Sequence, residues 1–445
     1  MRTTGAFSNG SGCGNEVATE FAMTRQYIRD SCKYWVNEYH VDGFRFDLMG
    51  LMDVECMNQI REDLDQIDSR LYMWGEGWTG GTSYHDTKTY TGAKFYAATQ
   101  ANAGMVNDRV AFFSDQIRNG IKGTVFDINE KGFIAGNTSY AKAIRYGVRA
   151  NTYKPANATD WGWTSTAPSQ TVTYAACHDN ATLYDQISAS TGKKYGVRDA
   201  DSVKKSKMAS AILNTSQGVT FYLAGDEMAR TKYGDTNSYK SSPEINKITW
   251  NNAVDYADLV GYYSGMMKIK ANYTPLTSMD KSFEDNFKFF NTTPSLDVNS
   301  DNVQFEITTN TEGEWKTMLV IHNAAATDKT FTVNGASADE WVIIANDRCA
   351  GVDNLGEVQG KTFEVPAYSS MIAVDKASFE AAAIPSDTGK VIVNYKYGSA
   401  DGAEFAPSTT VTGKIGAGYQ VLPTSGVDPK YEFDSVIGED TGVVS

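Results

Sequence analysis

The sequence predicts an α/β protein with a parallel sheet, followed by an antiparallel β domain, and two patterns support this fold class. Up to about residue 275, short apolar runs alternate with amphipathic segments, as strands and helices do around a parallel sheet. Beyond that point the pattern changes to period-two runs separated by Asn, Gly, Asp and Thr clusters, which is typical of antiparallel strands.

The elements can be placed in chain order from these patterns. A helix is expected over 16–40, with Asn15 as its N-cap, because apolar residues recur there at helical spacing. Strands are expected at 41–46, 71–76, 110–115, 171–177 and 218–225, and helices at 48–67, 202–215 and 254–271. Antiparallel strands are expected at 303–309, 316–323, 329–335, 340–346, 361–367 and 371–375. This gives an α/β domain (1–275), a β domain (276–375), a linker (376–389) and a third, strand-rich unit (390–445).

The composition excludes several classes of function. The 445 residues include 40 basic and 54 acidic side chains, so the net charge of -14 disfavours nucleic acid and anionic membranes as partners. The chain contains no apolar run of membrane-spanning length and no signal-peptide pattern at its start. Five cysteines without a CxxC pair indicate neither a zinc cluster nor a disulfide framework.

Three predicted strands end in carboxylates. Asp47 follows the first strand, Glu76 ends the second, and Asp179 follows the strand over 171–177. Because the carboxyl ends of parallel strands meet at one edge, these side chains are expected to face one site. A pair of carboxylates there fits glycoside hydrolysis, although barrels also place acids at strand ends for metals or salt bridges.

The strings around these carboxylates resemble a known family. VDGFRFDLMG, MWGEGW and ACHDNATLYD, in that order, are similar to the second, third and fourth conserved regions of the α-amylase family, glycoside hydrolase family 13. SNGSGCGNE (8–16) and GDEMARTKYGDTNSYKSSPEIN (225–246) extend the resemblance to type I pullulanases, which are α-1,6 debranching enzymes. The resemblance covers about residues 1–375.

The resemblance implies roles for individual residues. Asp47 would be the nucleophile, Glu76 the general acid/base and Asp179 the carboxylate that stabilises the transition state, with retention of configuration. The implied substrate-binding residues are Arg45, His178, Trp78, Asn237 and Tyr239. Structural alternatives stay open for each of these residues. Arg45 could serve only as an ion-pair partner, Trp78 could pack in the barrel, and His178 could be a structural histidine. Asn237 and Tyr239 could simply belong to a polar surface loop. We expect no cofactor and predict no metal ligands, although some relatives carry calcium.

The resemblance also implies that part of the fold lies outside this sequence. The family's first conserved region has no counterpart before Val41, so the chain would hold strands 4 to 8 of an incomplete TIM (β/α)8 barrel, followed by an antiparallel β-sandwich. We therefore hypothesise that the sequence is a C-terminal portion of a longer reading frame. Strand edges left open by the missing strands would make the isolated chain poorly soluble and inactive.

The last segment, 390–445, resembles a mucin-binding-protein (MucBP) repeat of bacterial surface proteins. This resemblance implies mucin or a surface glycan as a partner, and an extracellular or cell-surface location for the full-length parent. The expected function is a glycosidase that cleaves α-1,6 branches in pullulan, glycogen or starch dextrins. The alternatives are an α-1,4-acting relative and a non-catalytic glycan- or mucin-binding surface protein.

Overall fold

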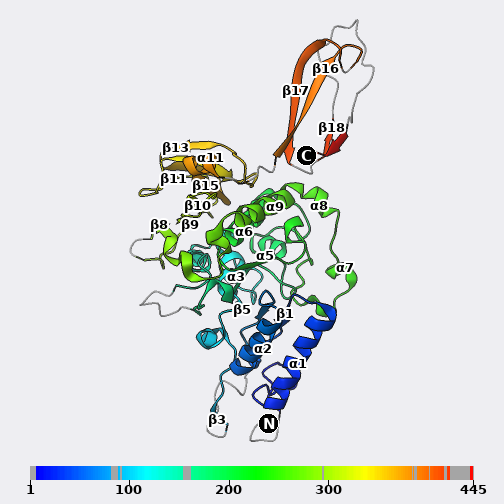
Figure 1. Cartoon of the computed structure of the whole chain (residues 1–445), viewed down its shortest axis with the longest axis vertical. Coiled ribbons are helices and arrows are strands. Elements are labelled where there is room, and N and C mark those ends of the chain that lie inside the picture. Colours follow the sequence, from blue (N-terminus) through cyan, green and yellow to red (C-terminus); the bar gives the residue numbers. More distant parts are fainter. Residues whose placement is uncertain are drawn as a thin grey trace.

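The computed structural model describes residues 7–81, 89–90, 93–153, 162–292, 295–382, 384, 388–399, 401–414, 418–420 and 441–443. Figure 1 shows the helices and parallel strands of the first part, then a β-rich part, and last the C-terminal strands. The predicted order of α/β part and β part is therefore confirmed.

Five parallel strands form the sheet of the first part. Their order follows the chain: β1 (Gly43–Phe46), β2 (Tyr72–Gly75), β5 (Val110–Phe113), β6 (Thr171–Tyr174) and β7 (Val219–Phe221). Each lies within a predicted strand, and each neighbouring pair runs parallel. The inner strands β5 and β6 are buried along their whole length, whereas the edge strands β1 and β7 are half-buried. The sheet is thus a half-barrel with two outer edges.

Helices connect and cover these strands (Figure 1). They are α1 (Ala22–Tyr39), α2 (Val54–Ile67), α3 (Asp115–Lys122), α4 (Ala141–Gly147), α5 (Leu183–Ser190), α6 (Ala200–Asn214), α7 (Pro243–Asn246), α8 (Asn252–Asp255), α9 (Ala257–Ala271) and α10 (Thr274–Thr277). A further helix, α11 (Lys376–Ala381), follows the last strand of the β-rich part and lies against that part (Figure 1). A short pair of strands, β3 (Thr89–Tyr90) and β4 (Ala93–Lys94), follows β2.

Three predicted helices have different bounds from those expected. The first begins at Ala22, not at 16, because Asn15 belongs to a tight loop in which its carbonyl accepts a hydrogen bond from Ser11 Oγ. The second begins at Val54, since a 3₁₀ helix (Met49–Leu51) occupies its predicted start. The helix predicted over 254–271 is divided at Tyr256 into α8 and α9.

The β part is a sheet of six antiparallel strands covered by a two-stranded ribbon. The six-stranded sheet has the order β13 (Glu357–Gln359), β12 (Glu340–Ala345), β15 (Ser369–Asp375), β10 (Thr317–Asn323), β9 (Asn302–Thr308) and β8 (Phe287–Phe290), and the ribbon pairs β11 (Lys329–Thr332) with β14 (Thr362–Val365). All six predicted runs are strands, while β8 and β13 are additional.

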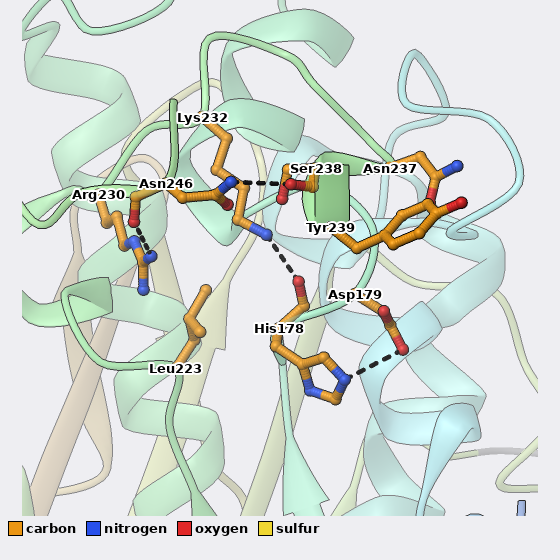
Figure 2. A pocket seen from close by; sticks show the side chains of 9 residues that line it. All are labelled: His178, Asp179, Leu223, Arg230, Lys232, Asn237, Ser238, Tyr239 and Asn246. Carbon is orange, nitrogen blue, oxygen red and sulfur yellow. Dashed lines mark hydrogen bonds and ion pairs between the residues drawn. The ribbon is translucent and has the colours of Figure 1, made fainter. Parts of the chain in front are cut away.

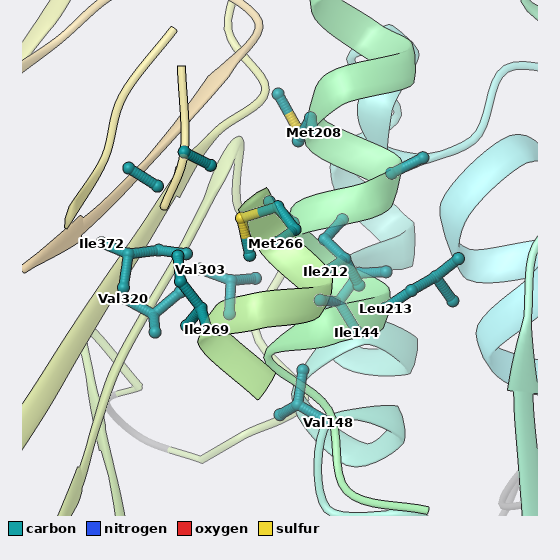
Figure 3. Packing of buried hydrophobic residues seen from close by; sticks show 14 of the residues in the cluster. Ile144, Val148, Met208, Ile212, Leu213, Met266, Ile269, Val303, Val320 and Ile372 are labelled. Carbon is teal, nitrogen blue, oxygen red and sulfur yellow. The ribbon is translucent and has the colours of Figure 1, made fainter. Parts of the chain in front are cut away.

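The six-stranded sheet buries both faces, as the period-two pattern requires. In β10, Leu319 and Ile321 pack with the ribbon, whereas Met318 and Val320 pack with the helices of the first part. Figure 3 shows this second face, where Met266 and Ile269 of the helices lie near Val320 and Ile372. One continuous hydrophobic core therefore joins the half-barrel helices to the β-sheet.

The C-terminal segment contains the hairpin β16 (Thr388–Lys396) and β17 (Glu404–Lys414) and the strands β18 (Gly418–Gln420) and β19 (Thr441–Val443). These strands agree with the strand-rich unit predicted over 390–445, much of which lies outside the described residues. Among the residues that the structure describes, no helix has the length and apolarity that crossing a bilayer requires.

Candidate active site

Two of the predicted catalytic carboxylates meet at one arginine. Arg45, on β1, forms an ion pair through Nη1 with Asp47, and its Nη2 lies 2.9 Å from Glu76 Oε1. Neighbouring strands β1 and β2 bring the three side chains together, because Arg45 is in register with Trp74, two residues before Glu76. The structure thus places Arg45, Asp47 and Glu76 at the carboxyl ends of adjacent strands, as predicted from their positions.

Glu76 is the buried member of this group. It is 7% exposed, and its Oε2 accepts a hydrogen bond of 2.9 Å from the backbone N–H of Leu48. Burial raises the pKa of Glu76 above its usual value, the Leu48 N–H and the Arg45 charge oppose this, and the charges of Asp47 and Asp179 add to it. A carboxyl group in these surroundings is suited to hold a proton for general acid catalysis.

Leu48 reaches Glu76 through an unusual backbone conformation. Its φ of 43° lies in the left-handed region, which a leucine adopts at a cost of about 1 kcal/mol or more. The loop is further tied to β2, since the Gly50 N–H donates to the Glu76 carbonyl at 2.8 Å. The turn after Asp47 therefore fixes both the backbone and the side chain of Glu76.

Asp179 and His178 lie in the loop between β6 and α5. His178 Nε2 is 3.4 Å from Asp179 Oδ2, and both side chains are more than half exposed. Asn180, the next residue, has a left-handed φ of 62°. The charge of Asp179 also acts on Glu76, because it adds to the rise of the Glu76 pKa.

A pocket of about 210 Å³ opens beside this loop (Figure 2). The residues that line it are His178, Asp179, Leu223, Arg230, Lys232, Asn237, Ser238, Tyr239 and Asn246. The structure thus brings the predicted residues Asn237 and Tyr239 to the same pocket as His178 and Asp179. The ring of Tyr239 is 73% exposed, so it is available to stack on a sugar.

Trp78 does not line this pocket. Its ring is half-buried against the cluster of Phe113 and Tyr174, and the Arg118 guanidinium lies 5.9 Å from its centroid. These contacts agree with the packing alternative that the sequence left open for Trp78.

Several residues of the site were not predicted. Leu48 contributes through its backbone, and Arg230, Lys232, Ser238 and Asn246 line the pocket. Asp185 holds the pocket loop, because its carboxylate accepts hydrogen bonds from the N–H groups of Lys232 (2.7 Å) and Gly234 (3.3 Å). The side chains belong to the strings that carry the resemblance, which is the one sequence signal that could have indicated them.

In the described part of the chain, no group of three His, Cys, Asp or Glu side chains is arranged to hold a metal ion. The carboxylates at the site instead interact with Arg45, with the Leu48 N–H and with His178. The absence of a metal requirement stays a prediction.

Comparison with known proteins gives pullulanases as relatives. The chain is 33% identical to the pullulanase of Bacillus subtilis (strain 168) over 269 residues, which is 59% of this chain and 34% of that protein. It is 30% identical to pullulanase 1, chloroplastic, of Arabidopsis thaliana over 295 residues, or 56% of this chain and 30% of that protein. The chain thus spans about a third of the length of these curated relatives.

Solved structures of pullulanases have a similar fold. The pullulanase from Bacillus acidopullulyticus superposes with a TM-score of 0.72 at 34% identity, over 84% of this chain and 43% of that chain. The pullulanase from Anoxybacillus sp. LM18-11, complexed with maltotriose, gives a TM-score of 0.71 at 28% identity, over 84% and 48%. At the other end of the chain, the family model of the MucBP domain matches residues 390–445. Both resemblances expected from the sequence, to pullulanases and to MucBP, are confirmed.

Proposed function

We propose that this chain carries the catalytic carboxylates of a debranching glycosidase that cleaves α-1,6-glucosidic bonds in pullulan, glycogen or starch dextrins. The observation that carries the proposal is the asymmetry of Asp47 and Glu76 around Arg45. Glu76 is buried with a raised pKa, whereas the Asp47 side chain is 75% exposed and paired with the guanidinium. A buried acid with a raised pKa beside an exposed carboxylate that pairs with a guanidinium is the kind of arrangement that glycoside hydrolysis uses.

The proposed mechanism is a retaining double displacement. Asp47 attacks the anomeric carbon while Glu76 gives its proton to the departing glycosidic oxygen, and Glu76 then takes a proton from the water that releases the sugar. The carboxyl groups of retaining enzymes lie about 5 Å apart, and sharing one guanidinium keeps Asp47 and Glu76 close together. Asp179 faces the same site, where its charge stabilises the positive character of the transition state.

The substrate assignment rests on the pocket and on the relatives. Asn237 and Tyr239 offer an amide and an exposed aromatic ring beside Asp179, a combination that suits an uncharged sugar. The relatives are pullulanases, and one of the structural neighbours is complexed with maltotriose. Malto-oligosaccharide is therefore the proposed ligand of this pocket.

We further propose that the working enzyme contains additional strands. The five strands correspond to strands 4 to 8 of a (β/α)8 barrel, and both edge strands are half-buried, as they are where a barrel is open. The MucBP match suggests an extracellular or cell-surface protein whose last segment binds mucin or a surface glycan.

Product analysis with pullulan tests the proposed activity. Pullulan consists of maltotriose units joined by α-1,6 bonds, so a debranching enzyme releases maltotriose, and Asp47→Asn or Glu76→Gln should lower the rate by about 10²- to 10⁴-fold. Trisaccharides that retain an α-1,6 bond would instead indicate an α-1,4-acting enzyme. Binding of maltotriose without any hydrolysis would favour the non-catalytic glycan-binding alternative for the chain by itself.

A pull-down tests the second candidate function, which the MucBP match favours. Immobilised mucin should retain the whole chain, and a chain ended after Ile384, which keeps the core contacts of Ala382 and Ile384, should pass through while it still binds maltotriose. Equal retention of both chains would contradict a mucin-binding role for the last segment.

A further inference from the structure

Two buried lysines hold the loop that carries Asp179. Lys232 Nζ donates a hydrogen bond of 2.6 Å to the His178 carbonyl, and Lys122 Nζ donates one of 3.0 Å to the Ala181 carbonyl. Lys232 is 3% exposed and Lys122 is 2% exposed. The two carbonyls lie on either side of Asp179 and Asn180, so the lysines grip the loop at both ends. Figure 2 shows the bond from Lys232 beneath the pocket.

These lysines are costly for the fold, which indicates that they have a specific task. Burial lowers the pKa of Lys122 to about 8 and also lowers the pKa of Lys232. Nearby carboxylates oppose this effect only in part: the charge of Asp226 favours the charged form of Lys122, and the charges of Asp179 and Asp235 favour that of Lys232. A buried cation is unfavourable unless its hydrogen bonds and nearby charges compensate for the loss of hydration. The hydrogen bonds that these two ammonium groups make are to the loop carbonyls.

Lys232 also belongs to the pocket loop. Asp185, at the start of α5, is fully buried and accepts hydrogen bonds from the N–H of Lys232 and from the hydroxyl of Thr231. The same loop continues to Asn237 and Tyr239. The Asp179 loop and the pocket loop are thus joined twice, from Asp185 to the backbone at Lys232 and from the Lys232 ammonium back to His178.

The conformation of the Asp179 loop explains why it needs to be held. Asn180 occupies the left-handed region, and the Asp179 side chain is more than half exposed. Asparagine tolerates left-handed backbone better than other side chains except glycine. The two lysine hydrogen bonds fix the backbone on either side of this turn.

We propose that Lys232 and Lys122 are positioning residues that fix the backbone around Asp179, and that Lys232 couples this loop to the Asn237 and Tyr239 loop. This inference rests on the proposed function, since it assigns to the lysines the orientation of a carboxylate that meets the sugar. Contact of a malto-oligosaccharide with the pocket loop then orders the Asp179 loop, because one ammonium group connects the two.

Hydrogen–deuterium exchange of the full chain tests directly whether the two lysine hydrogen bonds hold the Asp179 loop. Lys232→Met retains the volume of the side chain but loses its donor, so amide exchange in 177–182 and 231–239 should increase about tenfold or more. Lys122→Met should have the same effect on 177–182 alone. Lys205→Met is the matched control, because Lys205 is also 3% exposed but lies over the Tyr368 ring, at the junction with the β-sheet.

Rescue and binding complete the test. Lys232→Arg restores a cationic donor and should recover protection of 177–182, and maltotriose should protect this loop in the parent chain but not in Lys232→Met. Unchanged exchange in Lys232→Met, or equal increases across the chain in Lys232→Met and Lys205→Met, would overturn the proposal. A parent chain that binds no maltotriose would refute the proposed function, whereas the exchange of 177–182 would still decide the role of the lysines.

Discussion

Glu76 is the residue whose surroundings define the chemistry of the site. The Arg45 charge lowers its pKa, while burial and the charges of Asp47 and Asp179 raise it, and burial is the largest of these effects. The proposed mechanism therefore places two requirements on Arg45, because the guanidinium that pairs with Asp47 also acts on Glu76, the proposed proton donor. We expect this balance to set the pH range of the proposed activity.

Replacing Arg45 should change that range. Arg45→Met removes a charge that lowers the pKa of Glu76, so this pKa should rise further. The alkaline limb of the pH–rate profile for pullulan, which reports loss of the acid proton, should move upward by the same amount. The maximal rate should fall, because Asp47 loses its ion-pair partner.

Arg70→Met is the control for this substitution, since Arg70 is exposed and pairs with Asp68 away from the site. A carboxyl titration followed by NMR gives the same answer without turnover. A Glu76 pKa that is unchanged or lower in Arg45→Met would contradict the electrostatic role of the arginine.

A buried histidine provides a second prediction at the residue scale. His322 on β10 is fully buried, its Nδ1 lies 2.8 Å from Ser370 Oγ, and burial lowers its pKa from 6.5 to about 3. The unfolded chain therefore takes up a proton first as the pH falls. Its contribution to stability is complete above pH 6.5 and is lost towards pH 3, at ~1.4 kcal/mol for each pH unit.

Urea unfolding at a series of pH values measures this effect. His322→Gln, which retains hydrogen-bonding capacity towards Ser370, should flatten the pH dependence of the free energy of unfolding in that window. Identical slopes in the parent and the variant would assign the acid sensitivity to other groups.

At the scale of elements, α9 packs so closely on the β-sheet that one helical position requires glycine. A Cβ at Gly265 would lie 1.8 Å from the Ala350 carbonyl oxygen, whereas a Cβ at Gly261, one turn earlier, would meet nothing within 4 Å. Gly265→Ala should destabilise the chain by about 1–3 kcal/mol despite the better helix propensity of alanine. Gly261→Ala should stabilise it by about 0.5–1 kcal/mol.

Thermal unfolding of the two variants compares these effects within one helix. A lower melting temperature for Gly265→Ala and a higher one for Gly261→Ala are the expected results. Similar shifts in both would mean that the separation between α9 and the β-sheet is not set by Gly265.

The elements were predictable where apolar periodicity decides them. The five parallel strands and the runs such as β10 have patterns that report burial directly. The start of α1 could not be predicted in this way. Asn15 is a residue type that often caps helices, but here it lies in a loop: the Asn9 side chain accepts a hydrogen bond from the Gly14 N–H, and the Ser11 hydroxyl donates one to the Asn15 carbonyl.

The candidate site likewise has residues that the sequence could predict and contacts that it could not. Asp47, Glu76 and Asp179 could be placed because each ends a strand within a recognisable string. The bonds from Leu48 to Glu76 and from Lys232 to His178 join residues 28 and 54 positions apart, so they depend on how the loops fold over one another. No local pattern reports such contacts.

For the whole molecule, the open side of the half-barrel has consequences in solution. Helix α1 exposes a group of large side chains, namely Met23, Tyr27, Tyr34, Trp35 and Tyr39, and the nearby edge strand β1 is half-buried. Exposed apolar patches and open strand edges promote association. We expect the purified chain to self-associate in a concentration-dependent manner.

Sedimentation velocity across a concentration series measures this behaviour. Tyr27→Glu combined with Trp35→Glu should shift the chain towards monomer, because both substitutions place a charge on the exposed face of α1. The same number of charges at Thr330 and Thr332, on the ribbon strand β11, should have little effect. A parent chain that stays monomeric at every concentration would contradict the expectation.

The hydrophobic core that joins the helices to the six-stranded sheet limits how this protein can be recombined. A chimera or expression boundary placed near residue 275 would separate Val320 and Ile372 from Met266 and Ile269, and would expose the apolar face that the half-barrel helices bury against the sheet. The half-barrel and the six-stranded sheet are therefore expected to be inherited together. A gene fusion that replaced the sheet would require compensating changes in α6 and α9, which pack against it. A junction after Ile384 avoids this constraint, because Phe379, Ala382 and Ile384 still pack on the same core, so segments beyond Ile384 can be exchanged between proteins more freely during evolution or in the laboratory.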